Sequence, residues 1–302
     1  MKYDLIIVGA GPAGMTAALY AARAGKRVLL LEGEGYGGQI TKSRAVENYP
    51  GIPAVNGMDL ADAMMAQIKE LGVELRYSAA TDLRATDGGY EVWMGAQSEC
   101  ARAVILATGL RHRKLGIPGE EEYIGKGVSF CAVCDGAFFR RREVAVVGGG
   151  NTAVQDALYL SEICSKVYLI HRREQFRAEE HLLVRARATD NIEFITNTVV
   201  SEIKGEMLLD SVILTNRQTG EKRELALSGL FEAVGHIPQN AAFGDAVALD
   251  ESGYLAAGED CRTNLPGVFA AGDCRQKEVR QLTTATADGT VAALAALAYL
   301  EQ

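Results

Sequence analysis

Two similar stretches decide the fold of this chain: YDLIIVGAGPAGMTAALYAARAGKRVLLLE at residues 3–32 and EVAVVGGGNTAVQDALYLSEICSKVYLIHRR at residues 143–173. Each begins with a β-branched apolar run, passes through a glycine turn into a helical segment, and ends with a second apolar run. This order is typical of a βαβ unit whose first turn binds the pyrophosphate of a dinucleotide. The sequence therefore predicts an α/β protein with two Rossmann-like dinucleotide-binding domains.

Aligning the two stretches pairs the positions of the glycine fingerprint, which are Gly9 with Gly148, Gly11 with Gly150, and Gly14 with Ala153. The first glycine of such a fingerprint permits a tight turn, the second lets the backbone approach the pyrophosphate, and the third position packs the helix on the strand. The amides at the start of the helix then face the phosphates. The alternative is two glycine turns that pack helices and bind nothing.

The end of each second apolar run indicates which nucleotide is bound. In the first copy this position is Glu32, whose carboxylate suits ribose hydroxyls and repels a phosphate. In the second copy it is His171, followed by Arg172 and Arg173, with Arg177 one turn further on. Guanidinium groups bind a 2′-phosphate through bidentate, charge-assisted hydrogen bonds. We expect NADPH in the second domain and a nucleotide without that phosphate, such as FAD, in the first. A solvated basic face is the alternative for these arginines.

The composition excludes several classes of function. The chain has 302 residues, enough for two domains, and its 48% hydrophobic and 23% charged residues are typical of a soluble globular protein. A formal net charge of -8 argues against nucleic acid as the main partner, because phosphate binding needs a basic face. The apolar run 291–300 is too short to span a bilayer, and Asp4 interrupts the one candidate signal peptide. We therefore expect a cytoplasmic protein that does not bind a membrane.

The remaining segments fit the same α/β pattern. Residues 55–72 and 179–188 have the apolar spacing of helices, and a glycine turn at 87–89 joins two alternating strands. A buried strand is predicted at 101–109, and the run 291–300 predicts a packed C-terminal helix.

Proline and glycine punctuate the chain at 111–120 and 234–240. We interpret these stretches as two crossings of one hinge, so that the second domain is inserted into the first. The expected domains are a discontinuous FAD-binding domain at 1–113 and 240–302, and an NADPH-binding domain at 114–239. Short linkers of this kind allow domains to rotate against each other.

The stretch SFCAVCDGAFF at residues 129–139 holds Cys131 and Cys134, followed directly by Asp135. The pair has three possible roles: half of a zinc site, a structural crosslink, or a disulfide that opens and closes in a reaction. A closed zinc site needs four ligands, so no metal site is expected. The other cysteines are solitary and are expected to be buried small hydrophobes, namely Cys100, Cys164, Cys261 and Cys274. A stable crosslink is uncommon in a reducing cytosol.

A series of motifs runs along nearly the whole chain: GAGPAG (9–14), GGQ (37–39), VENYPG (46–51), ATG (107–109), CAVCDG (131–136), GGGxxA (148–153), HRRxxFRA (171–178), and AAGD (270–273) followed by RQ (280–281). Through these motifs the chain resembles the low-molecular-weight, bacterial-type thioredoxin reductases. CAVCDG shortly before a GGG fingerprint, with HRRxxFRA after it, is the most specific combination.

The resemblance implies a homodimeric flavoenzyme that passes electrons from NADPH through FAD to an active-site disulfide and then to thioredoxin or a thioredoxin-like protein. The residues that it places along FAD are Gly9, Gly11, Pro12, Ala13, Gly14, Glu32, Gly37, Gly38, Gln39, Asn48, Gly109, Gly272, Asp273, Arg280, Gln281 and Leu282. The residues that it places along NADPH are Gly148, Gly150, Asn151, Thr152, His171, Arg172, Arg173 and Arg177.

The resemblance also assigns roles around the cysteine pair. It implies that Cys134 lies against the flavin, that Cys131 exchanges with the partner, and that Asp135 is the acid/base. A permanently ionised Asp135 would raise the pKa of a neighbouring thiol, so it is expected to carry a proton, with its pKa raised by desolvation. Phe138 and Phe139 resemble the aromatic edge that meets thioredoxin, and ordinary core packing is the alternative for both.

The second fingerprint departs from many relatives, which have Asp-Ser at 151–152 and an acid at 155. We expect Asn151 to cap the following helix and Gln155 to hydrogen-bond without charge. These substitutions relative to many relatives are expected to alter contacts to the nicotinamide half of NADPH, and hence the nucleotide preference.

The cysteine pair lies in the expected NADPH domain, whereas the flavin is expected in the other domain. A nicotinamide and a disulfide cannot occupy the same flavin face together, so the inserted domain is expected to rotate between half-reactions. Alternatives are a reductase of another thioredoxin-like or dithiol protein, and a flavin redox sensor without turnover. Relatives acting on glutathione or lipoamide carry their pair near the FAD fingerprint, whereas here no cysteine precedes Cys100.

Overall fold

The structure is a computed structural model that describes residues 1–43 and 45–302. The chain divides into two units, which are described separately. Unit 1 consists of Met1–Arg111 and Ile237–Gln302, and unit 2 consists of His112–His236. Each unit is built on a sheet with parallel strands, so the predicted α/β fold with two Rossmann-like units, the second inserted into the first, is confirmed.

Unit 1 contains a seven-stranded sheet in the order β3-β2-β1-β6-β5-β4, with β17 also pairing with β6. Its parallel part consists of β1 (Tyr3–Val8), β2 (Val28–Glu32), β3 (Glu74–Tyr77), β6 (Gln97–Leu106) and β17 (Val268–Ala270). The antiparallel part is added by β4 (Asp82–Thr86) and β5 (Gly89–Met94). The parallel strands place the turns that follow β1 and β6 at the same edge of the sheet, where α/β proteins bind their ligands.

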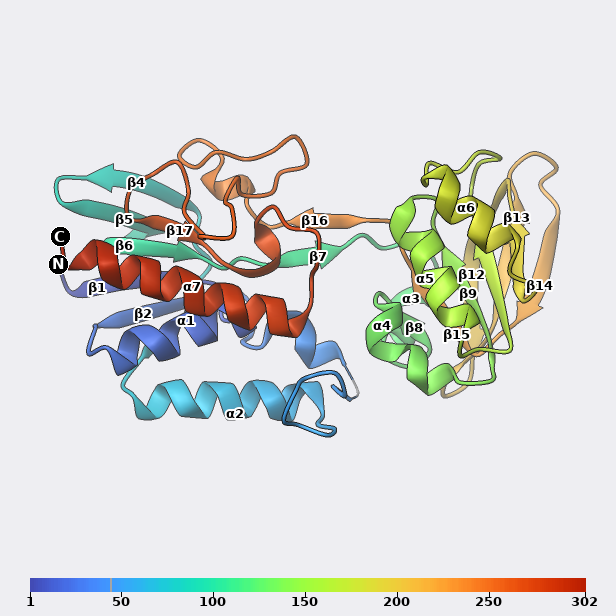
Figure 1. Ribbon diagram of the computed structural model, residues 1–302, viewed down its shortest axis with the longest axis horizontal. Helices are drawn as coiled ribbons and strands as arrows, with labels where there is room; N and C mark the ends of the chain where they lie inside the picture. The colour runs from blue at the N-terminus through green and yellow to red at the C-terminus, as the bar shows by residue number, and fades with distance from the viewer. Residues whose placement is uncertain (44) are drawn as a thin grey trace. The chain divides into compact units, whose positions relative to one another are not determined.

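The α-helices of unit 1 in the described ranges are α1 (Pro12–Arg23), α2 (Gly57–Glu70) and α7 (Leu282–Leu300). Helix α2 lies within the segment predicted at 55–72, and the Asn56 side chain caps it by accepting the N–H of Met58. Helix α7 starts earlier than the predicted run, at a capping box made by Gln281 and Thr284. α1 and α7 lie side by side (Figure 1), and they pack together closely because a Cβ at Gly289 would lie 2.3 Å from the Ala13 carbonyl oxygen.

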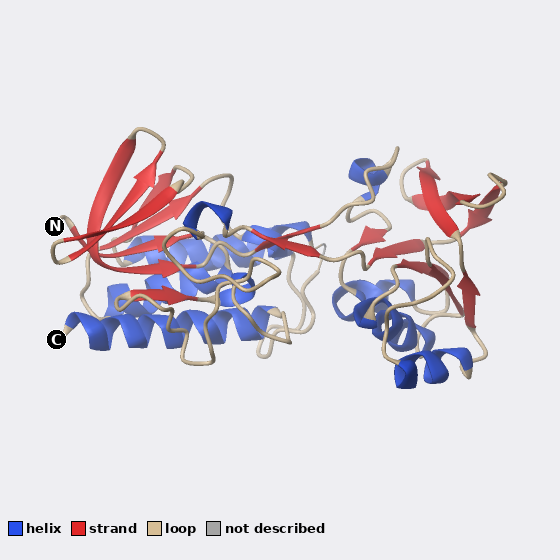
Figure 2. Cartoon of the chain, turned by 90° about the horizontal axis from the view of Figure 1, so that it is seen from above, coloured by secondary structure: helices blue, strands red, loops and turns tan. Residues whose placement is uncertain are grey.

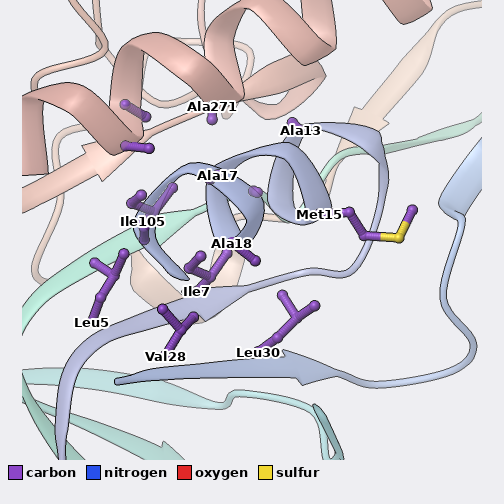
Figure 3. Close-up of a cluster of buried hydrophobic side chains, with 14 of the residues drawn as sticks. Leu5, Ile7, Ala13, Met15, Ala17, Ala18, Val28, Leu30, Ile105 and Ala271 are labelled. Atoms are coloured by element: carbon purple, nitrogen blue, oxygen red, sulfur yellow. The ribbon is translucent and has the colours of Figure 1, made fainter. Parts of the chain in front are cut away.

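The hydrophobic core of unit 1 follows from the alternation of side chains along β1. Leu5 and Ile7 point to the face that the helices cover, as Figure 3 shows together with side chains of β2, β6 and α1. Ile6 and Val8 point to the opposite face and pack, together with Tyr3 at the start of the strand, against the β4–β5 hairpin and the 243–274 region. Figure 2 shows the helices of unit 1 and the strands that they cover.

Unit 2 contains a five-stranded, all-parallel sheet in the order β11-β10-β9-β15-β8. Its strands are β8 (Val128–Ser129), β9 (Glu143–Val147), β10 (Lys166–Ile170), β11 (Ile192–Ile195) and β15 (Gly229–Glu232). A second, antiparallel sheet consists of β12 (Thr198–Gly205), β13 (Leu209–Asn216) and β14 (Lys222–Ala226). Helices cover one face of the parallel sheet and the antiparallel sheet covers the other, as expected for an all-parallel sheet.

Alternate residues of β9 point to opposite faces of the sheet and pack against different elements. Val144 and Val146 pack with α5 (Asn151–Ser161) and α6 (Glu180–Arg187), the latter lying within the helix predicted at 179–188. Ala145 and Val147 pack toward the β12–β13 side. Two short helices, α3 (Glu120–Tyr123) and α4 (Ala132–Asp135), complete unit 2.

The chain passes between the units at two short strands that pair with each other, β7 (Leu110–His112) and β16 (His236–Pro238). Four 3-10 turns account for the remaining short helical segments: η1 (Gly38–Lys42), η2 (Gly136–Phe139), η3 (Ala241–Phe243) and η4 (Gly272–Cys274). Over the described ranges, no helix is both long enough and apolar enough to cross a lipid bilayer.

Candidate functional site

The cysteine pair lies where the edge strand β8 turns into the single-turn helix α4. A disulfide joins Cys131 and Cys134, whose Cα atoms are 5.3 Å apart. Cys131 is the N-cap of α4, and its Sγ accepts the N–H of Cys134 at 3.2 Å. Both cysteines are half-buried. Because amide donors at a helix start favour a thiolate, this position suits a cysteine that reacts as a nucleophile.

Asp135 follows the pair directly, and its carboxyl contacts a residue that the sequence analysis did not select. The Ser129 hydroxyl donates to Asp135 Oδ2 at 2.6 Å and accepts the N–H of Cys131 at 3.1 Å. Burial raises the pKa of Asp135, and the hydrogen bond from Ser129 opposes part of that rise. The raised pKa is the direction expected for a carboxyl that exchanges a proton near neutral pH.

The remaining cysteines divide by burial. Cys164, Cys261 and Cys274 are buried, as predicted. Cys100 is only half-buried, so the prediction of burial was wrong there; it lies in β6 where that strand pairs with the antiparallel strand β5, before the part of β6 that pairs with β1. Among residues 1–43 and 45–302 there is no group of three or more His, Cys, Asp or Glu side chains that could hold a metal ion.

The first fingerprint forms a turn in which two glycines lie too close to backbone atoms to carry a side chain and a third borders open space. A Cβ at Gly9 would lie 2.2 Å from the Ala107 carbonyl oxygen, and a Cβ at Gly14 would lie 1.8 Å from the Gly9 carbonyl oxygen. A Cβ at Gly11, by contrast, would meet nothing within 4 Å. The backbone is therefore packed tightly on both sides of Gly11 and is open at Gly11 itself, where a pyrophosphate approaches in this class of fold.

Other segments of unit 1 converge on this turn. A Cβ at Gly38 would lie 3.4 Å from the Gly11 Cα, and a Cβ at Gly272 would lie 2.8 Å from the Ala13 Cβ. The N–H of Gly37 donates to the Ala10 carbonyl oxygen at 2.8 Å. Three of the segments that the resemblance assigns to FAD are thus brought together by the fold.

The polar residues predicted along FAD form hydrogen bonds within unit 1. Glu32 accepts the N–H groups of Ala10 and Glu34, each at 2.9 Å. The Gln39 amide donates to the Leu110 carbonyl oxygen, next to Gly109. The remaining contacts are Asn48 with Gln281, which precedes Leu282 at the start of α7, and Arg280 with the Asp273 carbonyl oxygen.

Asp273 has a buried carboxyl oxygen that tests whether the site fits a nucleotide. Its Oδ1 is shielded from solvent and has no hydrogen-bond partner among residues 1–43 and 45–302, and burial raises the pKa of the carboxyl. A buried polar atom without a partner is costly, so such atoms normally meet a ligand or water. Together with the open space at Gly11, this oxygen fits a nucleotide that donates hydrogen bonds, as the hydroxyls of FAD do.

The second fingerprint repeats this arrangement in unit 2. A Cβ at Gly148 would lie 2.5 Å from the Ala233 carbonyl oxygen, whereas a Cβ at Gly150 would meet nothing within 4 Å. His171 is buried, and its ring lies against Gly149, where a Cβ would be 2.1 Å from Cε1. The His171 ring therefore packs against the turn at Gly149, and the open space at Gly150 leaves room for a nucleotide.

Three exposed arginines surround this turn: Arg172, Arg173 and Arg177. Burial lowers the pKa of His171, and the charges of these arginines lower it further. The N–H of Arg177 also donates to the Gly149 carbonyl oxygen at 2.7 Å. The lowered pKa favours the neutral form of His171. The cationic arginine side chains remain at the surface near the turn, where they suit a phosphate.

Asn151 does not cap its own helix, so that prediction was wrong. The N-cap of α5 is Gly150, and the Asn151 side chain instead accepts the N–H of Glu179 and donates to its carboxylate. Glu179 is the N-cap of α6. Asn151 therefore ties the fingerprint turn to the next helix, while Thr152 and Gln155 are exposed.

The two adjacent phenylalanines have different environments. Phe139 packs edge-on against Phe231 with ring centroids 5.3 Å apart, and a Cβ at Gly229 would lie 2.6 Å from its ring. Phe138 is 43% exposed, and Val133 on α4 is 49% exposed. Core packing thus describes Phe139, and only Phe138 is available to a partner.

The fold and the site together define a disulfide oxidoreductase with two dinucleotide-binding units. A model of the family "Pyridine nucleotide-disulphide oxidoreductase" matches residues 3–289. The chain belongs to this family.

Within this family, the chain is similar to proteins named thioredoxin reductase. The chain is 46% identical over 304 residues to the thioredoxin reductase of Listeria innocua serovar 6a, covering 99% of this chain and 94% of the relative. It is 42% identical over 304 residues to the thioredoxin reductase of Bacillus subtilis strain 168, covering 99% and 95%. The crystal structure of thioredoxin reductase from Streptococcus pyogenes MGAS5005 matches with a TM-score of 0.95 and 43% identity, covering 99% of this chain and 98% of that chain.

Proposed function

We propose that this chain is a thioredoxin reductase that takes electrons from NADPH and delivers them, through FAD, to the Cys131–Cys134 disulfide and then to oxidised thioredoxin or a thioredoxin-like protein. The observation that carries the proposal is the disulfide at the start of α4, in a chain that is 42–46% identical to curated thioredoxin reductases. FAD and NADPH are the cofactors that the family implies. FAD supplies two-electron transfer between a nicotinamide and a disulfide.

Unit 1 holds FAD in this proposal. The glycine turn at Gly11 would hold the pyrophosphate, and Glu32 at the end of β2 would hold the ribose. The buried Oδ1 of Asp273 would accept a hydrogen bond from the nucleotide. Unit 2 would hold NADPH at the Gly150 turn, where Arg172 and Arg173 would bind the 2′-phosphate.

The cysteine pair performs the exchange with the partner. The Cys131 thiolate attacks one sulfur of the partner disulfide, forms a mixed disulfide and displaces a partner thiolate, which takes the proton of Asp135. The Asp135 carboxylate then removes the proton of the Cys134 thiol. The resulting thiolate attacks Cys131, restores the disulfide and releases the second partner sulfur, so that Asp135 ends with the proton that it gave away.

Partner docking involves the exposed apolar side chains next to the pair. Val133 and Phe138 lie on the segments that flank Cys134, and both side chains are well exposed. The basic side chains of Arg140 and Arg142 follow on the surface. We propose that a thioredoxin-like protein covers Phe138 while its disulfide meets Cys131.

Rotation of unit 2 between half-reactions is part of the proposal, with β7 and β16 as the hinge. The cysteine pair and the NADPH turn both belong to unit 2, so each must reach the flavin in turn. The proposal also includes a homodimer in the cytoplasm, which rests on the resemblance alone. A crosslink between the units that blocks rotation is expected to abolish turnover and to leave one half-reaction intact.

An anaerobic absorbance experiment tests the function. The purified protein should be yellow, should bleach when NADPH is added, and should recover its colour when oxidised bacterial thioredoxin follows. NADH is the matched control, and Arg172→Gln combined with Arg173→Gln should weaken bleaching by NADPH while leaving that by NADH unchanged. A flavin that bleaches but does not recover its colour with thioredoxin would indicate a sensor or a reductase of another dithiol protein.

A further inference from the structure

Ser129, at the end of β8, contacts both the proposed proton carrier Asp135 and the exchanging cysteine Cys131. Its hydroxyl donates to Asp135 Oδ2 at 2.6 Å and accepts the N–H of Cys131 at 3.1 Å. The residue is only 5% exposed. One buried hydroxyl therefore links the backbone of the exchanging cysteine to the carboxyl that follows the other cysteine.

The hydrogen-bonding capacity of a serine hydroxyl matches both protonation states of Asp135. A hydroxyl has one hydrogen to donate and two lone pairs to accept with. With Asp135 ionised, the hydroxyl donates to the carboxylate and accepts from Cys131. With Asp135 protonated, the carboxyl hydrogen is donated to Oγ, and the hydroxyl hydrogen turns to the Cys131 carbonyl oxygen, 3.4 Å away.

Neither state leaves a buried hydrogen without an acceptor. This matters because an unsatisfied polar group in a buried site is costly, and a proton carrier alternates between two sets of hydrogen bonds. The position of Ser129 is fixed independently of the cysteines, because β8 pairs with β15 in the parallel sheet through Ser129 and Phe231.

We propose that Ser129 is a positioning residue that holds the Asp135 carboxyl in place in both protonation states, so that Asp135 can give one proton to a departing thiolate and take one back. This inference rests on the proposed function, since a proton carrier is needed only if the cysteine pair turns over. Ser129 itself neither gains nor loses a proton over the cycle.

The chemistry predicts the direction of the effect of removing the hydroxyl. Burial raises the pKa of Asp135 and the Ser129 hydrogen bond lowers it, so Ser129→Ala should raise it further. The cysteine pair adjoins the carboxyl. Helix α5 packs against α4, and β15 packs against β8. The titratable side chains on these two neighbouring elements are Asp156 and Tyr159 on α5 and Glu232 on β15. Burial raises the pKa of Asp156 to about 7, so Asp156→Asn is needed to assign its contribution.

The test measures alkylation of the reduced pair, without NADPH or thioredoxin. The holoenzyme is reduced with dithiothreitol, and the rate of Cys131 alkylation by iodoacetamide is followed from acidic to alkaline pH. The thiolate reacts, and its reactivity depends on the charge of the neighbouring carboxyl, so the profile contains an inflection for each group. The inflection that Asp135→Asn abolishes belongs to Asp135.

Ser129→Ala should move that inflection upward by about one pH unit, and Ser129→Thr, which keeps the hydroxyl, should restore it. In the Asp135→Asn background, Ser129→Ala should cause no further change. Coincident profiles for wild type and Ser129→Ala, or an equal change in the Asp135→Asn background, would overturn the inference. A uniform loss of rate or of thermal stability at every pH would likewise reduce Ser129 to a packing residue.

The readout separates this inference from the proposed function. If wild-type protein does not restore its colour with thioredoxin, the proposed function fails, but the alkylation profiles still report whether Ser129 acts on Asp135.

Discussion

Arg275 and Asp288 form a doubly hydrogen-bonded ion pair in the interior of unit 1, with Nε to Oδ2 and Nη2 to Oδ1 both at 2.8 Å. The side chain of Arg275 is 1% exposed and that of Asp288 is 7% exposed. Asp288 Oδ2 also accepts Lys277 Nζ at 2.8 Å and the N–H of Gly272 at 3.0 Å. One carboxylate on α7 thus anchors the turn that carries Asp273.

Replacement of Asp288 by Asn should destabilise the protein by about 3 kcal/mol or more, because two buried cations lose their common counter-charge. Retention of FAD should weaken as well, since the Gly272 turn loses its anchor. Urea unfolding and the FAD content of purified protein measure the two effects. Glu259→Gln is the control: Glu259 also pairs with Arg275, but its side chain is 90% exposed, so the change should be small.

The same ion pair should make unit 1 sensitive to acid. Burial opposes ionisation of Asp288, but the hydrogen bonds of Arg275 and Lys277 outweigh it and lower the pKa below the ordinary value of 3.8. The stabilisation is therefore fully present above that value and is lost as the pH falls through the lowered pKa of the folded state. A wild-type advantage over Asp288→Asn that stayed constant into strong acid would contradict this account.

Glu232 should make unit 2 less stable as the pH rises. The residue is 3% exposed, and burial together with the hydrogen bond and the charge of the neighbouring Glu120 carboxyl raises its pKa from 4.5 to about 9. Between these values the folded protein holds a proton that the unfolded chain has released, so stability falls with increasing pH.

Glu232→Gln removes this titration, so its stability relative to wild type should improve between about pH 5 and about pH 8 in urea unfolding. The exposed Glu221→Gln is the matched control and should leave the pH dependence unchanged. Parallel curves for wild type and Glu232→Gln would mean that Glu232 is ionised in the folded protein.

Gly11 and Gly14 should respond differently to alanine. A Cβ at Gly14 would lie 1.8 Å from the Gly9 carbonyl oxygen, so Gly14→Ala should disrupt the packing of α1 and lower thermal stability. A Cβ at Gly11 meets no atom of the described residues within 4 Å, so Gly11→Ala should fold normally and lose FAD by steric exclusion. FAD content and the thermal midpoint of the apoprotein separate the two effects; normal FAD content in Gly11→Ala would argue against this turn as the nucleotide site.

Phe138 and Phe139 form a second matched pair. Phe139→Ala removes a ring that packs on Phe231 and should cost about 3 kcal/mol of stability. Phe138→Ala should leave stability nearly unchanged and raise the KM for thioredoxin, because the exposed ring is proposed to meet the partner. Steady-state assays with bacterial thioredoxin check this, and an unchanged KM would place the docking surface elsewhere.

Features that depend on neighbouring positions in the chain could be predicted from the sequence. The spacing of Gly9, Gly11 and Gly14 implies a turn between a strand and a helix, and the structure contains that turn with the close contacts that exclude side chains. The alternation in β1 likewise assigns Leu5 and Ile7 to one face. These are local regularities of backbone geometry, so they are visible in the order of residues alone.

Features that depend on contacts between distant segments could not be predicted from the sequence. Asn151 was expected to cap its own helix, but Glu179 lies within reach of its side chain and takes its place as the partner. Nothing in the sequence distinguishes Phe138 from Phe139; the ring of Phe231, contributed by β15, determines which of them is buried. Ser129 was overlooked because serine is common and its role depends on where Asp135 and Cys131 are held.

The sequence by itself determined the two nucleotide fingerprints, the cysteine pair and the family, because each is written in consecutive residues whose backbone geometry is local. Only the tertiary structure decided how these parts are completed. It brought Gly38 to Gly11 and Gly272 to Ala13, left one oxygen of Asp273 without a partner, and closed the hydrogen-bonded link from Cys131 through Ser129 to Asp135. Such contacts arise from the packing of segments far apart in the chain, and their hydrogen bonds form only when burial brings donor and acceptor together.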